Sequence, residues 1–232
     1  MDNEQKLTLK ISLPFIIAFI ALRHLIHELH ETSHMLLGRL WCGEWGTRDF
    51  NNVQPISKTC INAGTIPNIL EGPMVNYILI WVGALLIKYG SNPSNKSWGI
   101  SLIFASLPLA RVITALFGGG DEMGTAQTFI QNAYLARLVV LALMFIVLAY
   151  PLTIAFKSLC SRHRIIYFMS FLILPMLLEG FVVLLFFNHL LKIGIMDTIW
   201  FMGMPKLVVV VLIVDIIILL VFANRIKTLI RK

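Results

Sequence analysis

The sequence predicts an all-α, polytopic integral membrane protein with about six transmembrane helices. Of the 232 residues, 58% are hydrophobic and only 13% are charged, whereas an ordinary soluble domain carries about 25% charged residues. The apolar residues are also gathered into long blocks, each close to the ~20 residues that a helix needs to cross a bilayer. We place these blocks at about 11–38, 73–89, 98–117, 134–156, 165–191 and 206–223.

Three of the blocks have features of their own. The first is too long to lie wholly in hydrocarbon and does not lead to a small-residue cleavage site, so we expect it to remain in the mature protein. Pro73 opens the second block, where a first-turn position suits its missing N–H. Pro175 and Glu179 interrupt the fifth. The polar connection 41–70 is rich in Gly, Asn, Pro and Trp, which favours an ordered hairpin or re-entrant segment.

The net charge of +7 is explained by membrane topology rather than by nucleic-acid binding. Six spans place both termini and the second and fourth connections on one side, and that side holds eleven Lys and Arg residues against six on the other. The eleven are Lys6, Lys10, Lys88, Lys96, Lys157, Arg162, Arg164, Arg225, Lys227, Arg231 and Lys232; the six are Arg39, Arg48, Lys58, Arg137, Lys192 and Lys206. The positive-inside rule then predicts a cell (plasma or inner) membrane protein with both termini in the cytoplasm.

Cys42 and Cys60 fall together in connection 41–70, on the side that this topology places outside. A disulfide between them would suit an oxidising compartment, and two unpaired cysteines are equally compatible with the sequence.

The first block ends in the stretch LIHELHETSHML, within which residues 30–34 fit the pattern H-E-x-x-H. On an α-helix, His30 and His34 differ by about 40° in rotation and therefore face the same way. Two imidazoles can then share one zinc ion, and Glu31 can take a proton from water beside it. The alternative is a helix end that has left the bilayer with its histidines simply solvated. Ionisable residues in a membrane span are usually functional, which favours the metal site.

His27 lies on the same face one turn earlier. We expect it to support the site or relay protons rather than bind the metal, because three histidine ligands from one helix give an awkward geometry. A water-facing helix position is the alternative.

A catalytic zinc site usually has a third protein ligand and an open position. The stretch LFGGGDEMG follows the third block and lies on the same side as His30 and His34. Its glycines let the backbone fold tightly and dip between helices, so that Asp121 or, second to it, Glu122 can reach the metal. A plain exposed turn is the alternative.

Asn76, in EGPMVNY, would face inward near the same surface, where it could hydrogen-bond a substrate backbone or steady a loop. Arg111, Glu179 and Asp215 lie inside spans. They are candidates either for an ion or proton pathway or for structural pairs such as Arg111 with Asp215.

Together these elements resemble the site-2 protease family of intramembrane zinc metallopeptidases. The matching residues, in the family's order, are His30, Glu31 and His34, then Gly72, Pro73 and Asn76, then Asp121. The chain departs from the family pattern at Ser33, where glycine is usual, and around Asp121, which is followed by Glu122 instead of glycine.

The resemblance implies that His30, His34 and Asp121 hold zinc and that Glu31 activates water. It also implies a membrane-anchored or membrane-adjacent polypeptide as substrate. It covers about residues 11–135, so we divide the chain into a metallopeptidase-like membrane core at 1–132 and three additional transmembrane helices at 133–232. The alternative function is a non-catalytic metal-binding membrane protein that transports an ion or substrate or serves as an assembly scaffold.

Overall fold

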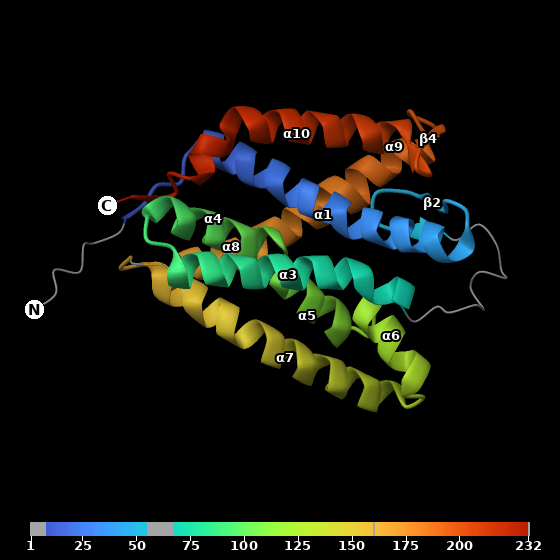
Figure 1. Ribbon diagram of the computed structural model, residues 1–232, viewed down its shortest axis with the longest axis horizontal. Coiled ribbons are helices and arrows are strands. Elements are labelled where there is room, and N and C mark those ends of the chain that lie inside the picture. Colours follow the sequence, from blue (N-terminus) through green and yellow to red (C-terminus); the bar gives the residue numbers. More distant parts are fainter. Residues whose placement is uncertain (1–7, 55–66, 160, 232) are drawn as a thin grey trace, which may run out of the picture.

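The computed structural model describes residues 8–54, 67–159 and 161–231, and these are mainly helical (Figure 1). The helices are α1 (Leu13–Cys42), α3 (Pro67–Tyr89), α4 (Pro93–Ala105), α5 (Pro108–Leu116), α6 (Asp121–Phe129), α7 (Ala133–Ser158), α8 (Arg164–Glu179), the π-helix η1 (Gly180–Phe187), α9 (Asn188–Lys192) and α10 (Lys206–Ile226). Short antiparallel pairs join β1 (Thr8–Leu9) to β6 (Ile230–Arg231), β2 (Thr47–Arg48) to β3 (Val53–Gln54) and β4 (Ile199–Phe201) to β5 (Met204–Pro205).

Six helical segments of the described chain are long and apolar enough to cross a membrane, which confirms the predicted fold class. They are Leu13–Cys42, Leu70–Tyr89, Pro93–Leu116, Ala133–Ser158, Arg164–Lys192 and Lys206–Ile226.

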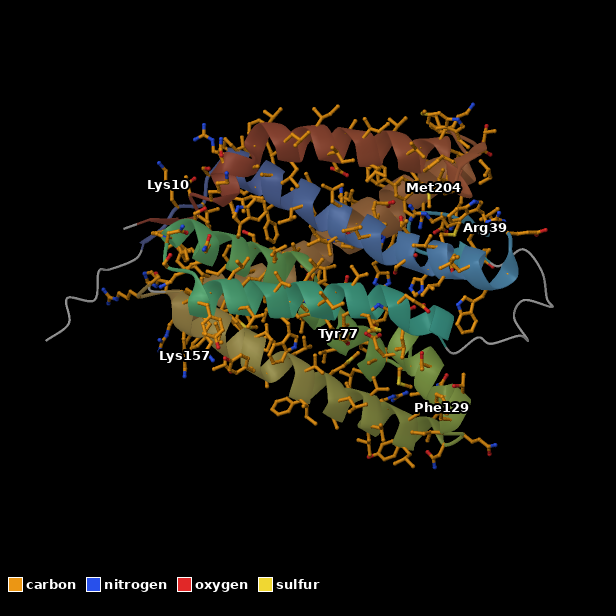
Figure 2. The ribbon with its side chains drawn as sticks, in the orientation of Figure 1. Lys10, Arg39, Tyr77, Phe129, Lys157 and Met204 are labelled. Atoms are coloured by element: carbon orange, nitrogen blue, oxygen red, sulfur yellow. The ribbon has the colours of Figure 1, made fainter. Side chains whose placement is uncertain are left out.

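The two ends of the bundle differ. β1 and β6, the first and last elements of the described chain, pair at one end, and β2, α6 and β4 lie at the other (Figure 1). Lys10 and Lys157 mark the end with the β1–β6 pair, whereas Arg39 and Phe129 mark the opposite end (Figure 2). The arrangement follows from an even number of spans, which must return the chain to the side on which it began.

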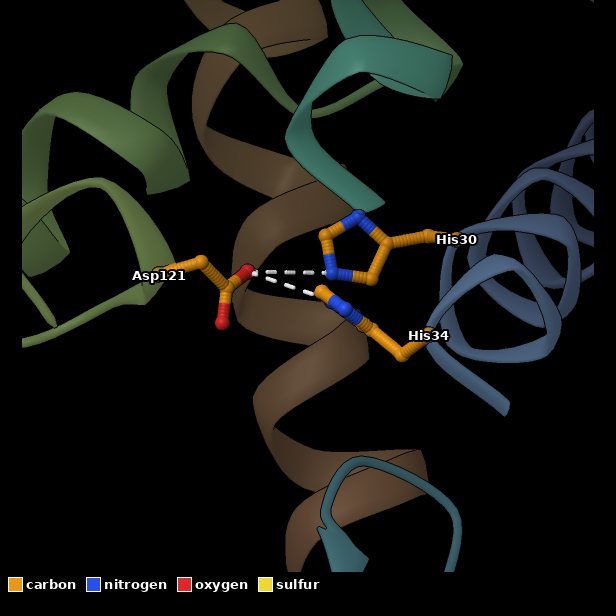
Figure 3. Close-up of side chains that lie close together, drawn as sticks. All are labelled: His30, His34 and Asp121. Carbon is orange, nitrogen blue, oxygen red and sulfur yellow. Dashed lines mark ion pairs between the residues drawn. The ribbon is translucent and has the colours of Figure 1, made fainter. Parts of the chain in front are cut away.

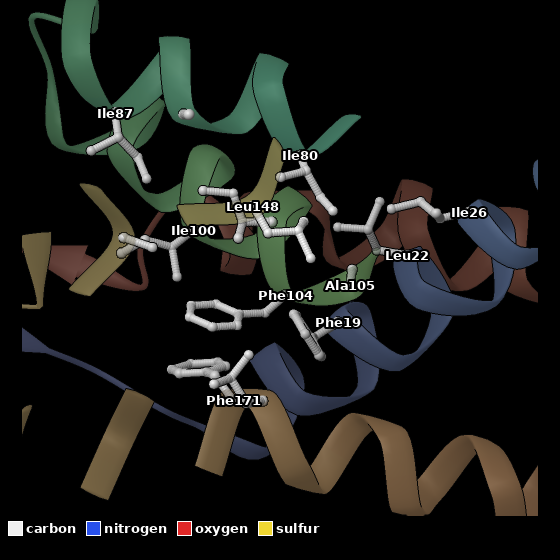
Figure 4. Close-up of a cluster of buried hydrophobic side chains, with 14 of the residues drawn as sticks. Phe19, Leu22, Ile26, Ile80, Ile87, Ile100, Phe104, Ala105, Leu148 and Phe171 are labelled. Atoms are coloured by element: carbon white, nitrogen blue, oxygen red, sulfur yellow. The ribbon is translucent and has the colours of Figure 1, made fainter. Parts of the chain in front are cut away.

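The bundle core is apolar and aromatic (Figure 4). Phe171 of α8 stacks on Phe104 of α4 with ring centroids 5.2 Å apart, and it meets Phe19 of α1 edge-on at 6.0 Å. Helices α3 and α4 approach backbone to backbone, because a Cβ added at Gly83 would lie 2.6 Å from the carbonyl oxygen of Gly99. Small residues at such contacts are a usual means of helix packing in membranes.

The third span is broken rather than continuous. Leu107 adopts a left-handed conformation with φ 51°, and Pro108 begins α5 directly after it. Proline disfavours the α-helical conformation of the preceding residue and lacks an N–H, so α4 cannot continue through this point. The break tilts α5 away from α4 (Figure 1).

The prediction that Pro73 occupies the first turn of its helix is wrong. Helix α3 begins at Pro67, which takes the first-turn position, and Pro73 lies inside the helix. The apolar pattern misplaced this start because the polar residues Glu71 and Gly72 precede the hydrophobic block, yet they are already helical.

The fifth span changes helical type where the sequence is interrupted. Helix α8 ends at Glu179, and the π-helix η1 follows. Short π-helical segments frequently occur at functional sites.

A buried network of charged side chains joins α1 to the C-terminal spans. Arg23 pairs with Glu179, and His27 Nδ1 lies 3.4 Å from the same carboxylate. His24, the residue after Arg23, has its Nδ1 3.2 Å from Asp215 Oδ2 of α10. The Arg23–Glu179 pair offsets two charges that would otherwise be costly inside a membrane.

The suggested pairing of Arg111 with Asp215 is therefore wrong. Asp215 faces His24, whereas Arg111 Nη2 lies 3.0 Å from Asp121 Oδ2 and Arg111 Nε lies 3.1 Å from Glu122 Oε1. The break at Pro108 directs α5 toward the first turn of α6, which the position of Arg111 in a continuous span could not indicate.

The described part of connection 41–70 is a β2–β3 hairpin that docks on the bundle. Arg48 is buried and pairs with Glu28 of α1, while the carbonyl oxygen of Phe50 lies 2.7 Å from His27 Nε2. Cys42 is disulfide-bonded, and its expected partner Cys60 lies outside the described residues.

Candidate metal centre

Helix α1 carries both candidate histidine ligands on one face. It starts at the N-cap Ser12 and runs unbroken to a left-handed C-cap at Gly43, so residues 30–34 lie well inside regular helix. The imidazoles of His30 and His34 are 5.0 Å apart between ring centroids, and the side chains are largely buried. The helical spacing thus places two imidazoles side by side, as the sequence predicts.

Asp121 arrives from a distant part of the chain. Gly118 and Gly120 adopt positive φ angles of 82° and 87°, which lets the chain turn sharply after α5 and begin α6 at Asp121. Asp121 Oδ2 lies 3.2 Å from His30 Nε2 and 3.7 Å from His34 Nε2 (Figure 3). The turn formed by the GGGDE stretch therefore directs the Asp121 carboxylate toward the two imidazoles.

The three side chains fit one zinc ion. One ligand atom from each lies within 4.8 Å of the other two. Two donors held by zinc at 2.0–2.2 Å in tetrahedral geometry are about 3.3–3.6 Å apart. The two histidine–aspartate separations match that spacing closely, and two imidazoles with one carboxylate are a donor set that catalytic zinc sites use.

Asp121 is held in its ionised form. Burial by itself would raise the pKa of this carboxyl group, but the hydrogen bonds to His30 and His34 and the charge of Arg111 outweigh burial and hold the pKa well below its usual value. A carboxylate must be deprotonated to bind a metal, so the environment of Asp121 suits that role.

The next residue, Glu122, points elsewhere. Its Oε1 accepts a hydrogen bond from Tyr77 Oη at 2.8 Å and lies 3.1 Å from Arg111 Nε. Of the two acidic residues that the sequence offered as third ligand, the structure thus brings Asp121 to the histidines. Arg111 bridges the two carboxylates, a role that the sequence did not reveal because it depends on the break in the third span.

Glu31 lies beside the ligand cluster. Its side chain is buried, and its Oε1 is 3.9 Å from His30 Nε2. At this distance, a water molecule near the imidazoles can also reach the carboxylate.

Gly72 forms a close wall of the site. A Cβ added there would lie 2.4 Å from His34 Nε2 and 2.5 Å from His30 Nε2, closer than side chains approach in real structures. The first turns of α3 therefore pack their backbone directly on both imidazoles. The sequence singled out this glycine only through the family resemblance; its physical reason is the absence of a side chain.

We predict that Gly72→Ala weakens zinc binding by about ten-fold or more, because the added methyl group must displace the two imidazoles that would hold the ion. Zinc titration of the purified protein against a competing chelator measures this. Gly38→Ala on α1 is the matched control, since a Cβ there meets nothing within 4 Å. Wild-type zinc affinity in Gly72→Ala would contradict the packing.

Asn76 and His27 take different positions around the site. Asn76 is buried on α3, and its Oδ1 has no hydrogen-bond partner within the described residues. His27 contacts Phe50 and Glu179 instead of the ligands, although its ring lies parallel to that of His30 at 6.4 Å. His27 thus ties the β2–β3 hairpin and the end of α8 to the helix that carries the ligands.

One further residue of the site could not be recognised from the sequence. Glu71 Oε2 lies 3.5 Å from His34 Nδ1, on the side of the imidazole away from Asp121. Glu71 sits beside Gly72 in the EGPMVNY stretch, and only the packing of α3 on α1 shows what it faces.

The fold and the site define a six-span helical membrane protein with a buried candidate metal centre of two histidines and one aspartate. No protein-family model, curated protein or solved structure matches the chain.

Proposed function

We propose that the protein is an intramembrane zinc metallopeptidase that hydrolyses a peptide bond of a membrane-anchored or membrane-adjacent polypeptide. The observation that carries the proposal is the convergence of His30, His34 and Asp121 from α1 and α6, with the buried Glu31 carboxylate next to them. The resemblance of these residues to the site-2 protease pattern supports the same function.

Each residue then has a distinct task. Zinc held by His30, His34 and Asp121 would act as a Lewis acid that polarises the peptide carbonyl and makes water easier to deprotonate. Glu31 takes the proton from water as the carbon–oxygen bond forms. It returns the proton to the departing amine as the carbon–nitrogen bond breaks, so the carboxylate ends the cycle unchanged.

Asn76 is the candidate for substrate binding. Its buried Oδ1 lacks a partner within the described residues, and an unpaired buried polar atom costs free energy. A backbone N–H of a bound polypeptide would satisfy it. We assign His27 to the support of α1, because it holds the hairpin and Glu179 in place.

We also propose that the protein lies in a plasma or inner membrane with both termini in the cytoplasm. The excess of Lys and Arg on the side to which six spans assign the termini supports cytoplasmic termini. The candidate metal centre, at the end of the bundle opposite the β1–β6 pair, then lies in the outer half.

An impermeant thiol reagent added to intact cells should therefore label Asn52→Cys above the level of the parent chain. Lys10→Cys should be labelled only after permeabilisation. Both positions are exposed. The opposite labelling pattern would show that the protein has the inverted orientation, with its termini outside.

A second candidate function is a non-catalytic metal-binding membrane protein that moves an ion or scaffolds an assembly. The observation that favours it is the row of buried ionisable residues formed by Arg23, Glu179, His24 and Asp215, since such residues often mark ion or proton pathways. The two functions differ in whether the Glu31 carboxylate is needed.

Purified protein should hold about one zinc ion per chain, and His30→Ala should abolish that binding because two donors alone bind zinc weakly. Metal analysis by mass spectrometry measures the ratio. His163→Ala, at an exposed position in the connection before α8, removes a histidine without touching the site and should leave the zinc content unchanged. Full zinc retention in His30→Ala would exclude the proposed centre.

A further inference from the structure

Glu71 is a buried carboxylate with little to bind. Its side chain is 10% exposed, and neither of its oxygens makes a hydrogen bond within the described residues. Its ion-pair partner is His34, whose Nδ1 lies 3.5 Å from Glu71 Oε2. A buried charge is costly unless it is paired, so this carboxylate needs an explanation beyond packing.

The two nitrogens of the His34 imidazole face two different carboxylates. Nε2 is directed to Asp121 Oδ2 at 3.7 Å, and Nδ1 is directed to Glu71. Histidine can offer only one nitrogen to a metal while the other carries a proton, and the partner of that proton selects which nitrogen is free. With its proton on Nδ1, His34 would direct that N–H group at Glu71 and leave Nε2 for the metal.

The backbone of α3 fixes Glu71 in this place. Gly72 packs directly on both imidazoles, which leaves α3 no room to move closer and holds the preceding residue against His34. The second histidine differs, because His30 Nδ1 is buried and has no partner within the described part of the chain. The support is therefore specific to His34.

We propose that Glu71 is the positioning residue of the metal centre: its carboxylate would accept a hydrogen bond from Nδ1–H of His34 and so fix the tautomer and orientation in which Nε2 binds zinc. This inference rests on the proposed metal centre and adds a residue that neither the H-E-x-x-H motif nor the family resemblance assigns. It requires no contact between Glu71 and the metal ion.

The test compares zinc affinity in the purified full chain for wild type, Glu71→Ala, Glu71→Gln and Glu44→Gln. We expect Glu71→Ala to weaken zinc binding by about 10–100-fold, the usual effect of removing a partner of a metal-binding histidine. Glu71→Gln keeps an acceptor oxygen but loses the charge, so its loss should be smaller. Glu44 is exposed, and Glu44→Gln controls for the change in net charge without effect on affinity.

Cobalt substitution separates a positioning residue from a ligand. The visible absorption of bound Co²⁺ reports its coordination number, and we expect the same spectrum in wild type and in cobalt-saturated Glu71→Ala. A changed spectrum would make Glu71 a ligand and overturn the proposal, as would unchanged zinc affinity in both Glu71 variants. If wild type itself binds neither metal, the metal centre fails before Glu71 is tested, so the two failures are distinguishable. Equal thermal unfolding of wild type and Glu71→Gln shows that the loss of affinity is not a loss of fold.

Discussion

On the proposed peptidase function, Glu31→Gln is expected to abolish peptide cleavage while the protein keeps its fold and the zinc that it would bind. Glutamine has nearly the same size and hydrogen-bonding reach as glutamate, so the buried position of Glu31 remains filled. Its amide cannot accept a proton from water, and general-base catalysis alone contributes about 10²–10⁴-fold in rate. Cleavage should therefore fall by at least that factor.

The cleavage products themselves identify the substrate in this measurement. Membranes of cells producing wild type or Glu31→Gln are compared by quantitative N-terminal proteomics, which reports new chain ends in membrane-anchored proteins. Glu44→Gln, at an exposed position, is the charge-matched control and should give the wild-type pattern. If Glu31→Gln gives the wild-type pattern of chain ends while His34→Ala does not, the metal is structural or transported rather than catalytic. The second candidate function would then replace the first.

Glu179→Ala is expected to destabilise the protein by about 3–5 kcal/mol, which is the usual cost of leaving one partner of a buried ion pair without the other. Arg23 is 3% exposed, and its partner in the bundle is Glu179. Without that carboxylate the guanidinium group remains buried and charged. Thermal unfolding of the detergent-solubilised protein measures the effect.

The double variant Arg23→Met/Glu179→Met provides the sharper comparison. Replacing a buried ion pair by apolar side chains of similar volume is often neutral or stabilising, so the double variant should unfold closer to wild type than Glu179→Ala does. Neither variant changes His27 or Phe50, whose contact holds the hairpin to α1 in the wild-type chain. Lys206→Met, at an exposed position, should change the free energy of unfolding by less than about 0.5 kcal/mol. A double variant as unstable as Glu179→Ala would contradict the explanation by an unpaired charge.

The six spans and the shared face of His30 and His34 could be predicted from the sequence because both are local properties. A span depends on about 20 consecutive apolar residues, and a helical face depends on the spacing of residues within one helix. The structure confirms the spans and shows the two imidazoles side by side.

The points at which helices start or break were harder to predict. The third span reads as one apolar block, yet Leu107 and Pro108 divide it, and α3 begins at Pro67 although its apolar block starts near Pro73. Hydrophobicity reports where a segment can lie in a membrane, whereas backbone geometry decides where a helix starts, bends or ends.

Tertiary structure alone decided the partners of the charged residues. The turn at Gly118 and Gly120 presents Asp121 to the histidines and leaves Glu122 to Tyr77 and Arg111. The sequence could place the two adjacent acids at the same end of the predicted bundle as the histidines but could not choose between them.

Glu71 illustrates the same limit. Nothing in its sequence neighbourhood links it to His34, which lies on another helix, and only the close packing of α3 on α1 at Gly72 brings the two together. The sequence by itself determined the spans and the two-histidine motif, because hydrophobic length and helical periodicity act over a few turns of one helix. Contacts between helices far apart in the chain decided the rest: the approach of Asp121 to the histidines, the approach of Glu71 to His34, and the buried ion pairs. In these contacts, packing rather than local pattern sets which side chains meet.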